Sequence, residues 1–287
     1  MRRLLFAAAL LFGCLPVDTR PPPAEVLVTL RGAPSTIDGV TTADGWAIRF
    51  DRVVVTVGGS DLEGDGCDEY ADAGYFRILD GRVAAPQKVG LMFGLGDCTF
   101  EMRARNPEFD TLLGQGVTEE DKTRMRTPGS DPFESNVGIT FVVRGSAERA
   151  GVRKTFDWSF RNNRVSYDGC VIDGQKTFAL SQNAPTTIDL QVHAEALFHD
   201  RLDPDEATVR FDPIAAADDG DGVVTLEELT EVPLADAAVT FDVDAETKDW
   251  KTLGDFVYRG LFPRIVRPGD RGTCTMATTR RGGGPMH

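Results

Sequence analysis

The residues best suited to chemistry lie in one acidic stretch, Ala217 to Glu228, with the sequence Ala-Asp-Asp-Gly-Asp-Gly-Val-Val-Thr-Leu-Glu-Glu. Carboxylates alternate along its first half, Gly222 permits a sharp turn, and an acid ends the stretch. Oxygen ligands at this spacing suit a hard cation such as calcium, which also accepts a backbone carbonyl and a bridging water. The expected calcium ligands are Asp219, Asp221, Val223 through its carbonyl, Thr225 and Glu228.

This stretch resembles an EF-hand loop, in which Gly222 takes the turn position and Glu228 the final bidentate position. The first position departs from the pattern, because Ala217 stands there and Asp218, one residue late, is the candidate replacement ligand. The flanking helices are expected to be short, so the resemblance implies a single structural site with a dissociation constant on the order of 0.1 to 1 mM. The alternative is a solvated acidic turn without an ion.

Two histidines flank a glutamate in the segment from Val192 to Asp200. Imidazoles are good ligands for copper, so His193 and His199 are candidate copper ligands; the alternative is two surface histidines. The stretch from Gln191 to Glu228, with its order of His, Phe, Asp and calcium-like loop, is similar to MbnP-like periplasmic proteins. That resemblance implies a β-sandwich and copper near the two histidines.

The N-terminus combines Arg2 and Arg3 with a short apolar run from Leu4 to Gly13, followed by Cys14. An apolar core of this length is too short to span a bilayer and is typical of an export signal. Leu11-Phe12-Gly13-Cys14 resembles a bacterial lipobox, which implies that residues 1–13 are removed and that Cys14 carries diacylglycerol and palmitate. The alternative is an ordinary secretory leader cut elsewhere.

Residues 14–25 form a proline-rich segment, expected to be an extended tether between the lipid and the folded domain. Leu15, directly after the cysteine, favours the outer membrane over retention at the inner membrane. The leader, the phrase from Gly45 to Arg52 and the calcium-like loop together resemble bacterial outer-membrane lipoproteins. We therefore expect a lipid-anchored protein of the cell envelope, facing the periplasm or the outer surface.

Four cysteines remain in addition to Cys14. An even number in an exported chain predicts two disulfides, for which three pairings are possible. No two cysteines have the spacing of a zinc site, and the chain has 3 histidines. The preferred pairing is Cys67 with Cys98 and Cys170 with Cys274.

The charge of the chain limits its partners. It has 45 acidic against 31 basic residues, a formal net charge of −14. Nucleic acid is therefore excluded as an expected partner, since phosphate binding needs clustered lysine and arginine. A protein or polymer partner in the envelope remains open.

Alternating apolar residues predict many short strands, among them a hairpin formed by residues 139–143 and 156–160, and a bulge near Asp51. Helices are expected from Pro107 to Leu113, from Thr118 to Met125, and at residues 245–261, where Pro263 ends the last one. Residues 26–276 are expected to be one antiparallel β-sandwich domain with short helical insertions, and residues 277–287 a disordered tail.

Motifs of several enzyme classes are missing from the sequence. There is no Gly-x-Ser-x-Gly, no His-Glu-x-x-His and no phosphate-binding Gly-x-x-x-x-Gly-Lys. The expected function is therefore non-enzymatic: a binding or structural role at the envelope, with a weak structural calcium site. Two alternatives remain, a periplasmic copper-binding protein of the MbnP-like type and an envelope hydrolase.

Overall fold

The protein is mainly β, as the sequence predicts. The structure, a computed structural model, describes residues 20–71, 73–237, 241 and 249–279. Strands take up 47% of it and helices 18%. The strands are β1 Ala24–Gly32, β2 Val40–Thr41, β3 Ala47–Glu63, β4 Asp68–Ala71, β5 Ala73–Asp80, β6 Gln87–Arg105, β7 Leu112–Leu113, β8 Ile139–Arg149, β9 Val152–Arg161, β10 Arg164–Val171, β11 Phe178–Leu180, β12 Thr186–Val192, β13 Val223–Val224, β14 Val266–Pro268 and β15 Thr273–Thr279.

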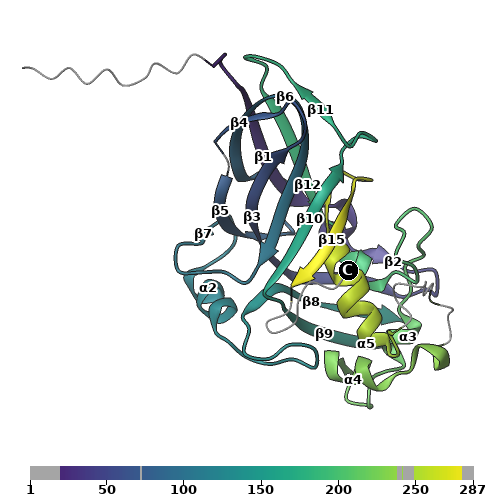
Figure 1. The fold of residues 1–287 in the computed structure, drawn as a ribbon. Helices are drawn as coiled ribbons and strands as arrows, with labels where there is room; N and C mark the ends of the chain where they lie inside the picture. Colours follow the sequence, from purple (N-terminus) through teal and green to yellow (C-terminus); the bar gives the residue numbers. More distant parts are fainter. Residues whose placement is uncertain (1–19, 72, 238–240, 242–248, 280–287) are drawn as a thin grey trace, which may run out of the picture.

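The helices are all short, and most lie late in the chain. They lie mainly at the lower end of the sheet, where α3, α4 and α5 gather in Figure 1. The α-helices are α1 Pro34–Asp38, α2 Glu119–Arg126, α3 Asp212–Ala215, α4 Leu226–Glu231 and α5 Leu253–Asp255. The 3₁₀ and π segments are η1 Ala194–Phe198, η2 Leu234–Asp236, η3 Phe256–Leu261 and η4 Phe262–Arg264.

All of these strands are joined by pairing into one curled sheet, whose longest path runs β13-β9-β8-β3-β6-β1-β12-β14. Most pairs are antiparallel, but β1 with β12, β5 with β7 and β9 with β13 are parallel. The sheet is therefore mixed, mostly antiparallel as expected, with three parallel pairs that the sequence analysis did not anticipate. The division into the two stacked sheets of a sandwich stays a prediction.

The sheet curls because its two longest strands change partners along their length. β6 has 19 residues and pairs first with β1, then with β4 and β11, and finally with β3 and β10. Register shifts interrupt several of these ladders, and one between Phe50 and Arg52 confirms the predicted bulge. At Gly96 (φ +100°) a β-carbon would lie 1.6 Å from the Gly66 carbonyl oxygen, so only glycine fits this crossing.

The predicted hairpin is confirmed as β8 and β9, and its aromatic residues belong to the core. Phe156, Trp158 and Phe160 are at most 1% exposed. They pack against Phe198 and Phe262 from the helical segments, with ring centroids 4.7 Å apart for Phe160 and Phe262. This aromatic cluster fixes the hairpin to the segments that carry the candidate sites.

Three local predictions meet different outcomes. The helix expected from Thr118 is confirmed as α2, which begins with a capping box between Thr118 and Asp121. The helix expected from Pro107 to Leu113 is wrong: the chain turns and then forms β7 beside β5, because pairing with a sheet edge outweighs the proline start signal. The strand expected around Val239 and Val243 lies outside the described residues.

The last helix differs from the predicted 245–261 at both ends. Residues 245–248 lie outside the described part, and the helix starts at Leu253, where Thr252 and Asp255 form a capping box. It continues as η3 and η4 through Arg264. Pro263 does not end it, because proline at the second position of a new 3₁₀ turn removes no hydrogen bond.

Two disulfides are present, with the preferred pairing. Cys67, in the turn between β3 and β4, joins Cys98 of β6, and Cys170 of β10 joins Cys274 of β15. The second closes a separation of 104 residues and fixes the last strand to the sheet.

The ordered strands reach slightly beyond the expected domain limits of 26 and 276. β1 begins at Ala24 and β15 runs to Thr279. Cys14 and the leader lie outside the described residues. Within the described ranges, no helix has the length and apolar character needed to cross a bilayer.

Candidate functional site

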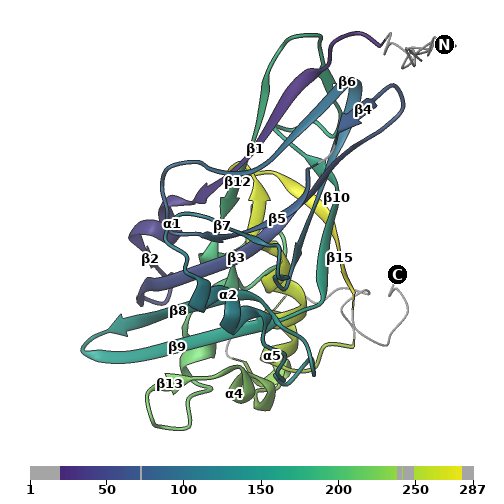
Figure 2. The same ribbon diagram turned by 90° about the vertical axis from the view of Figure 1, so that its left-hand side faces the viewer.

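The predicted calcium loop lies at the lower end of the molecule, held between α3 and α4 and against the β8–β9 hairpin (Figure 2). Val223 and Val224 form β13, which pairs in parallel with Thr155 and Phe156 of β9. The Trp158 indole N–H donates to the Val224 carbonyl at 2.8 Å. The loop is therefore anchored to the core at its second half, while its acidic first half faces outward.

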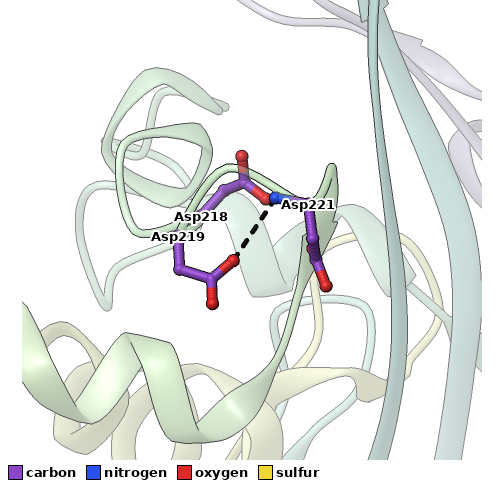
Figure 3. A group of neighbouring side chains, drawn as sticks. All are labelled: Asp218, Asp219 and Asp221. Carbon is purple, nitrogen blue, oxygen red and sulfur yellow. Dashed lines mark hydrogen bonds between the residues drawn. The ribbon is translucent and has the colours of Figure 1, made fainter.

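The structure brings together three carboxylates of the loop. Asp218, Asp219 and Asp221 place ligand oxygens within 4.8 Å of one another, and they are the one group of this kind among the described residues (Figure 3). Asp218 replaces the missing first ligand in one respect: its Oδ1 accepts the Gly222 N–H at 2.7 Å and so closes the turn. The bond from the Asp221 N–H to Asp219 Oδ1 at 3.3 Å continues this closure.

The final acid of the loop already has protein partners. Glu228 accepts hydrogen bonds from the N–H groups of Asp219 and Thr225 and from the Thr225 hydroxyl, at 2.6 to 2.9 Å. Burial by itself would raise the pKa of Glu228, but these bonds hold it below its ordinary value. Thr225 is the N-cap of α4, so two predicted ligands also form a capping box.

A lysine that the sequence analysis missed is paired with this loop. The Lys154 ammonium of β9 contacts Asp218 Oδ2, and the Asp218 side chain is 2% exposed. This bond lowers the pKa of Asp218 below its ordinary value. Lys154 thus supplies a fixed positive charge next to the expected calcium ligands, and it competes with a cation for Asp218.

The two candidate copper ligands lie inside the protein, so the surface-histidine interpretation is wrong. His193 is 6% exposed and His199 is 9% exposed, on either side of η1. His193 Nδ1 lies 2.9 Å from Glu195 Oε1, while its Nε2 is buried and has no hydrogen-bond partner in the part of the chain that the structure describes. Strand parity alone could not show this, because η1 turns the chain inward directly after β12.

Burial shapes the electrostatics of this histidine segment. Burial, helped by the positive charge of Arg267, lowers the pKa of His199 to about 4. Burial alone would raise the pKa of Glu195, but the hydrogen bond from His193 holds it below the ordinary value. His199 is therefore neutral at pH 7, beside an ionised Glu195.

A pocket of about 380 Å³ opens where β10 and β15 meet η4, β14 and the loop at Leu202. Its wall includes Tyr167, Leu202, Arg264, Val266, Arg267 and Met276. Cys274 also lines it, so the disulfide to Cys170 fixes the strand that forms one side. The sequence analysis missed this pocket because its wall comes from three segments far apart in the chain, with no motif in any of them.

Comparison with known proteins gives no match to a family model, a curated protein or a solved structure.

Proposed function

We propose that this protein is a lipid-anchored, non-enzymatic binding protein of the cell envelope, which holds a small ligand in the pocket between β10, β14 and β15. The observation that carries the proposal is the pocket itself. Its volume of about 380 Å³ is in the range of small-molecule sites, and its wall mixes apolar side chains with a few polar groups. A disulfide and paired strands keep one side of it rigid.

A binding role is supported over the hydrolase alternative by the residues of the pocket wall. Among the described residues that line it, the ionisable groups are a tyrosine, two arginines and the exposed Asp203, while Cys274 is oxidised. Hydrolysis would need a nucleophile next to a base, or two carboxylates across a substrate. This wall offers neither arrangement.

The binding role can be tested by blocking the pocket. Thr273 is exposed on β15 and lines the opening, so Thr273→Trp should fill the space without disturbing the core. Thr275→Trp is the matched control, since Thr275 is exposed on the same strand outside the pocket wall. Native mass spectrometry of protein purified from envelopes should show a bound small molecule in the wild type and the control, and none in Thr273→Trp. Equal ligand content in all three would contradict the proposal.

The anchoring part of the proposal rests on the sequence around Cys14. Metabolic labelling with palmitate should mark the wild type and fail with Cys14→Ser. Unchanged fractionation with membranes after Cys14→Ser would remove lipidation as the anchor.

Calcium belongs to this proposal as a weakly bound ion that stabilises the loop of residues 217–228. Asp218, Asp219 and Asp221 lie at its turn, Glu228 of α4 accepts a hydrogen bond from the Asp219 N–H, and Lys154 limits the affinity of the loop for an ion. Its test is given in the Discussion.

Copper handling is a second candidate, favoured by one specific observation. Metal-binding histidines commonly have one ring nitrogen fixed by a carboxylate, and His193 shows this arrangement with a buried, unpartnered Nε2. No group of three acidic, histidine or cysteine ligands around either histidine is found among the described residues, so copper there would have few protein ligands. Stoichiometric copper uptake that His193→Ala abolishes would support this role, and no uptake by the wild type would exclude it.

A further inference from the structure

We propose that the pocket between β10, β14 and β15 takes a ligand with one compact oxyanion, a carboxylate or a phosphate monoester, attached to a short apolar body. Arg267 and Tyr167 bind the oxyanion, and the apolar body packs on the opposite wall. This inference rests on the proposed function, since it names the ligand class of the same pocket.

Arg267 is the first of two mostly buried residues in the pocket wall with donor groups that have no partner among the described residues. It is 8% exposed, and its Nε donates to the Arg264 carbonyl at 3.1 Å. The described residues supply no ion-pair partner and no hydrogen bond for its two terminal nitrogens. A guanidinium without a direct ion pair keeps its terminal donors available, and a planar pair of N–H donors matches a carboxylate or phosphate.

Tyr167 is the second such group. It is 2% exposed, it lines the same pocket, and its hydroxyl has no hydrogen-bond partner among the described residues. Burial raises the pKa of Tyr167, so the phenol stays protonated and able to donate at neutral pH. Neither the Tyr167 hydroxyl nor a terminal nitrogen of Arg267 is among the fully buried unpartnered atoms of the described residues, so both groups can be reached from the pocket they line. Two donors accessible from one cavity favour a ligand that supplies an acceptor for both.

The other charges around the pocket favour a ligand with one oxyanion group over a ligand with several. Arg264 adds a second positive charge to the wall, and the exposed Asp203 adds a negative one. Burial lowers the pKa of Arg267, and the more distant carboxylates Glu195, Asp205 and Asp270 partly offset that effect. A polyanion would be repelled by these acids, whereas one oxyanion matches the charge of Arg267.

The rest of the wall suits an apolar group. Val266 is buried, while Leu202 and Met276 are half-buried and line the same space. Methionine adapts its shape to different partners, so the wall can accept an alkyl or aryl body. A ligand with its oxyanion on Arg267 and its carbon chain toward these side chains satisfies both parts of the pocket.

The experiment is isothermal titration calorimetry of the purified chain with four probes that share one alkyl chain: hexanoate, hexyl phosphate, hexanol and hexylamine. At least one acid should bind saturably and at least tenfold more tightly than hexanol and hexylamine. The two acids separate the possible sources, because a carboxylate-selective pocket and a phosphate-selective pocket rank them in opposite order.

Variants then assign the contact. Arg267→Met should weaken acid binding at least tenfold and leave hexanol binding unchanged, and Tyr167→Phe should weaken acid binding about threefold to tenfold. Arg210→Met is the matched control, because Arg210 pairs with Asp200 and does not line this pocket. Folding of each variant is checked by circular dichroism, and Arg267→Lys is a second test, since it keeps the charge but loses the paired donors.

Failure of this inference and failure of the proposed function give different results. Hexanol binding as tight as the acids, with no effect of Arg267→Met, would overturn the oxyanion class and leave a binding pocket. No binding of any probe and no ligand recovered from envelopes would overturn both.

Discussion

The pocket between β10, β14 and β15 and the acidic loop of residues 217–228 both gather charged side chains, but they treat those charges differently. In the pocket, Arg267 is almost fully buried, and the carboxylates whose charge acts on it, Glu195, Asp205 and Asp270, form no direct ion pair with it among the described residues. In the loop, Asp218 is just as well covered, but Lys154 and the Gly222 N–H already occupy its oxygens. The charge of Arg267 in the pocket thus remains without a direct ion pair, whereas the charge of Asp218 in the loop is paired within the chain.

This difference shows where the protein depends on something outside itself. A mostly buried cation without a direct ion pair is unfavourable, because desolvation is costly, and a bound oxyanion would offset that cost. A loop closed by its own hydrogen bonds needs no ion to keep its shape, so an ion can add only a modest stability. We therefore assign ligand recognition to the pocket and a minor structural role to the loop.

The largest effect is expected from removing the disulfide that holds the pocket wall. Changing both Cys170 and Cys274 to serine should lower the free energy of unfolding by about 2 to 4 kcal/mol, since the bridge closes a long loop. It should also abolish acid binding, because β15 is no longer fixed. Urea unfolding and calorimetry measure the two effects.

The matched control changes both Cys67 and Cys98 to serine. Their bridge closes a separation of 31 residues, and neither cysteine lines the pocket. This variant should lose a similar amount of stability but keep acid binding. Acid binding retained without the Cys170–Cys274 bridge would contradict a rigid, preformed pocket.

Calcium should have the next largest effect, confined to the loop. For a dissociation constant of about 0.1 to 1 mM, 10 mM calcium should stabilise the fold by about 1.4 to 2.7 kcal/mol relative to EDTA. Glu228→Gln should remove this response. Glu227→Gln is the control, because Glu227 is exposed on the same helix and is not an expected ligand. No calcium response in the wild type would mean that the loop is complete without an ion.

Lys154→Met tests the difference between the loop and the pocket further, because it removes the ammonium that pairs with Asp218 in the loop. In EDTA the variant should be slightly less stable, since Asp218 loses its partner. Its calcium affinity should rise several-fold, because the ion no longer competes with the ammonium. Arg153→Met, at an exposed neighbour on β9, should change neither value. Unchanged calcium affinity in Lys154→Met would show that Asp218 is not a ligand.

The smallest effect is expected at Glu101, which lies near other acidic side chains. Burial and the charges of Asp168, Glu63 and Asp61 raise the pKa of Glu101 to about 7. Its proton is held more tightly in the folded than in the unfolded state, so ionisation of Glu101 destabilises the fold as pH rises from 4.5 to above 7.

Glu101→Gln should therefore stabilise the protein at pH 8 and have little effect at pH 4. Solvent screening keeps the gain below about 1 kcal/mol. Glu119→Gln, at an exposed site on α2, should show no such pH dependence. Equal effects of Glu101→Gln at both pH values would rule out repulsion between ionised Glu101 and its acidic neighbours.

Local patterns predicted much of this structure. Alternation located the β8–β9 hairpin, the bulge before Arg52 followed from a change in parity, and Thr118 with Asp121 marked the start of α2. The preferred cysteine pairing is also confirmed. The hairpin, the bulge and the helix start depend on residues close together in the sequence, and four cysteines allow only three disulfide pairings.

The parts that sequence could not give depend on contacts between distant segments. Nothing near Lys154 indicates Asp218 as its partner, and nothing near Arg267 indicates that Tyr167 lines the same cavity. The proline before Glu108 predicted a helix, but pairing of β7 with β5 decided the conformation there. Burial of His199 likewise follows from η1 and the aromatic core, which alternation along a strand cannot show.

The most direct test of the central claim is urea unfolding of the wild type and Arg267→Met, each with and without saturating hexanoate or hexyl phosphate. Without ligand, Arg267→Met should be as stable as the wild type or more stable, because it removes an unpaired buried charge. With ligand, the wild type should gain stability and the variant should not, so the order of the two proteins reverses. A variant that is much less stable without ligand, together with a wild type that neither acid stabilises, would show that Arg267 serves the fold and not a ligand.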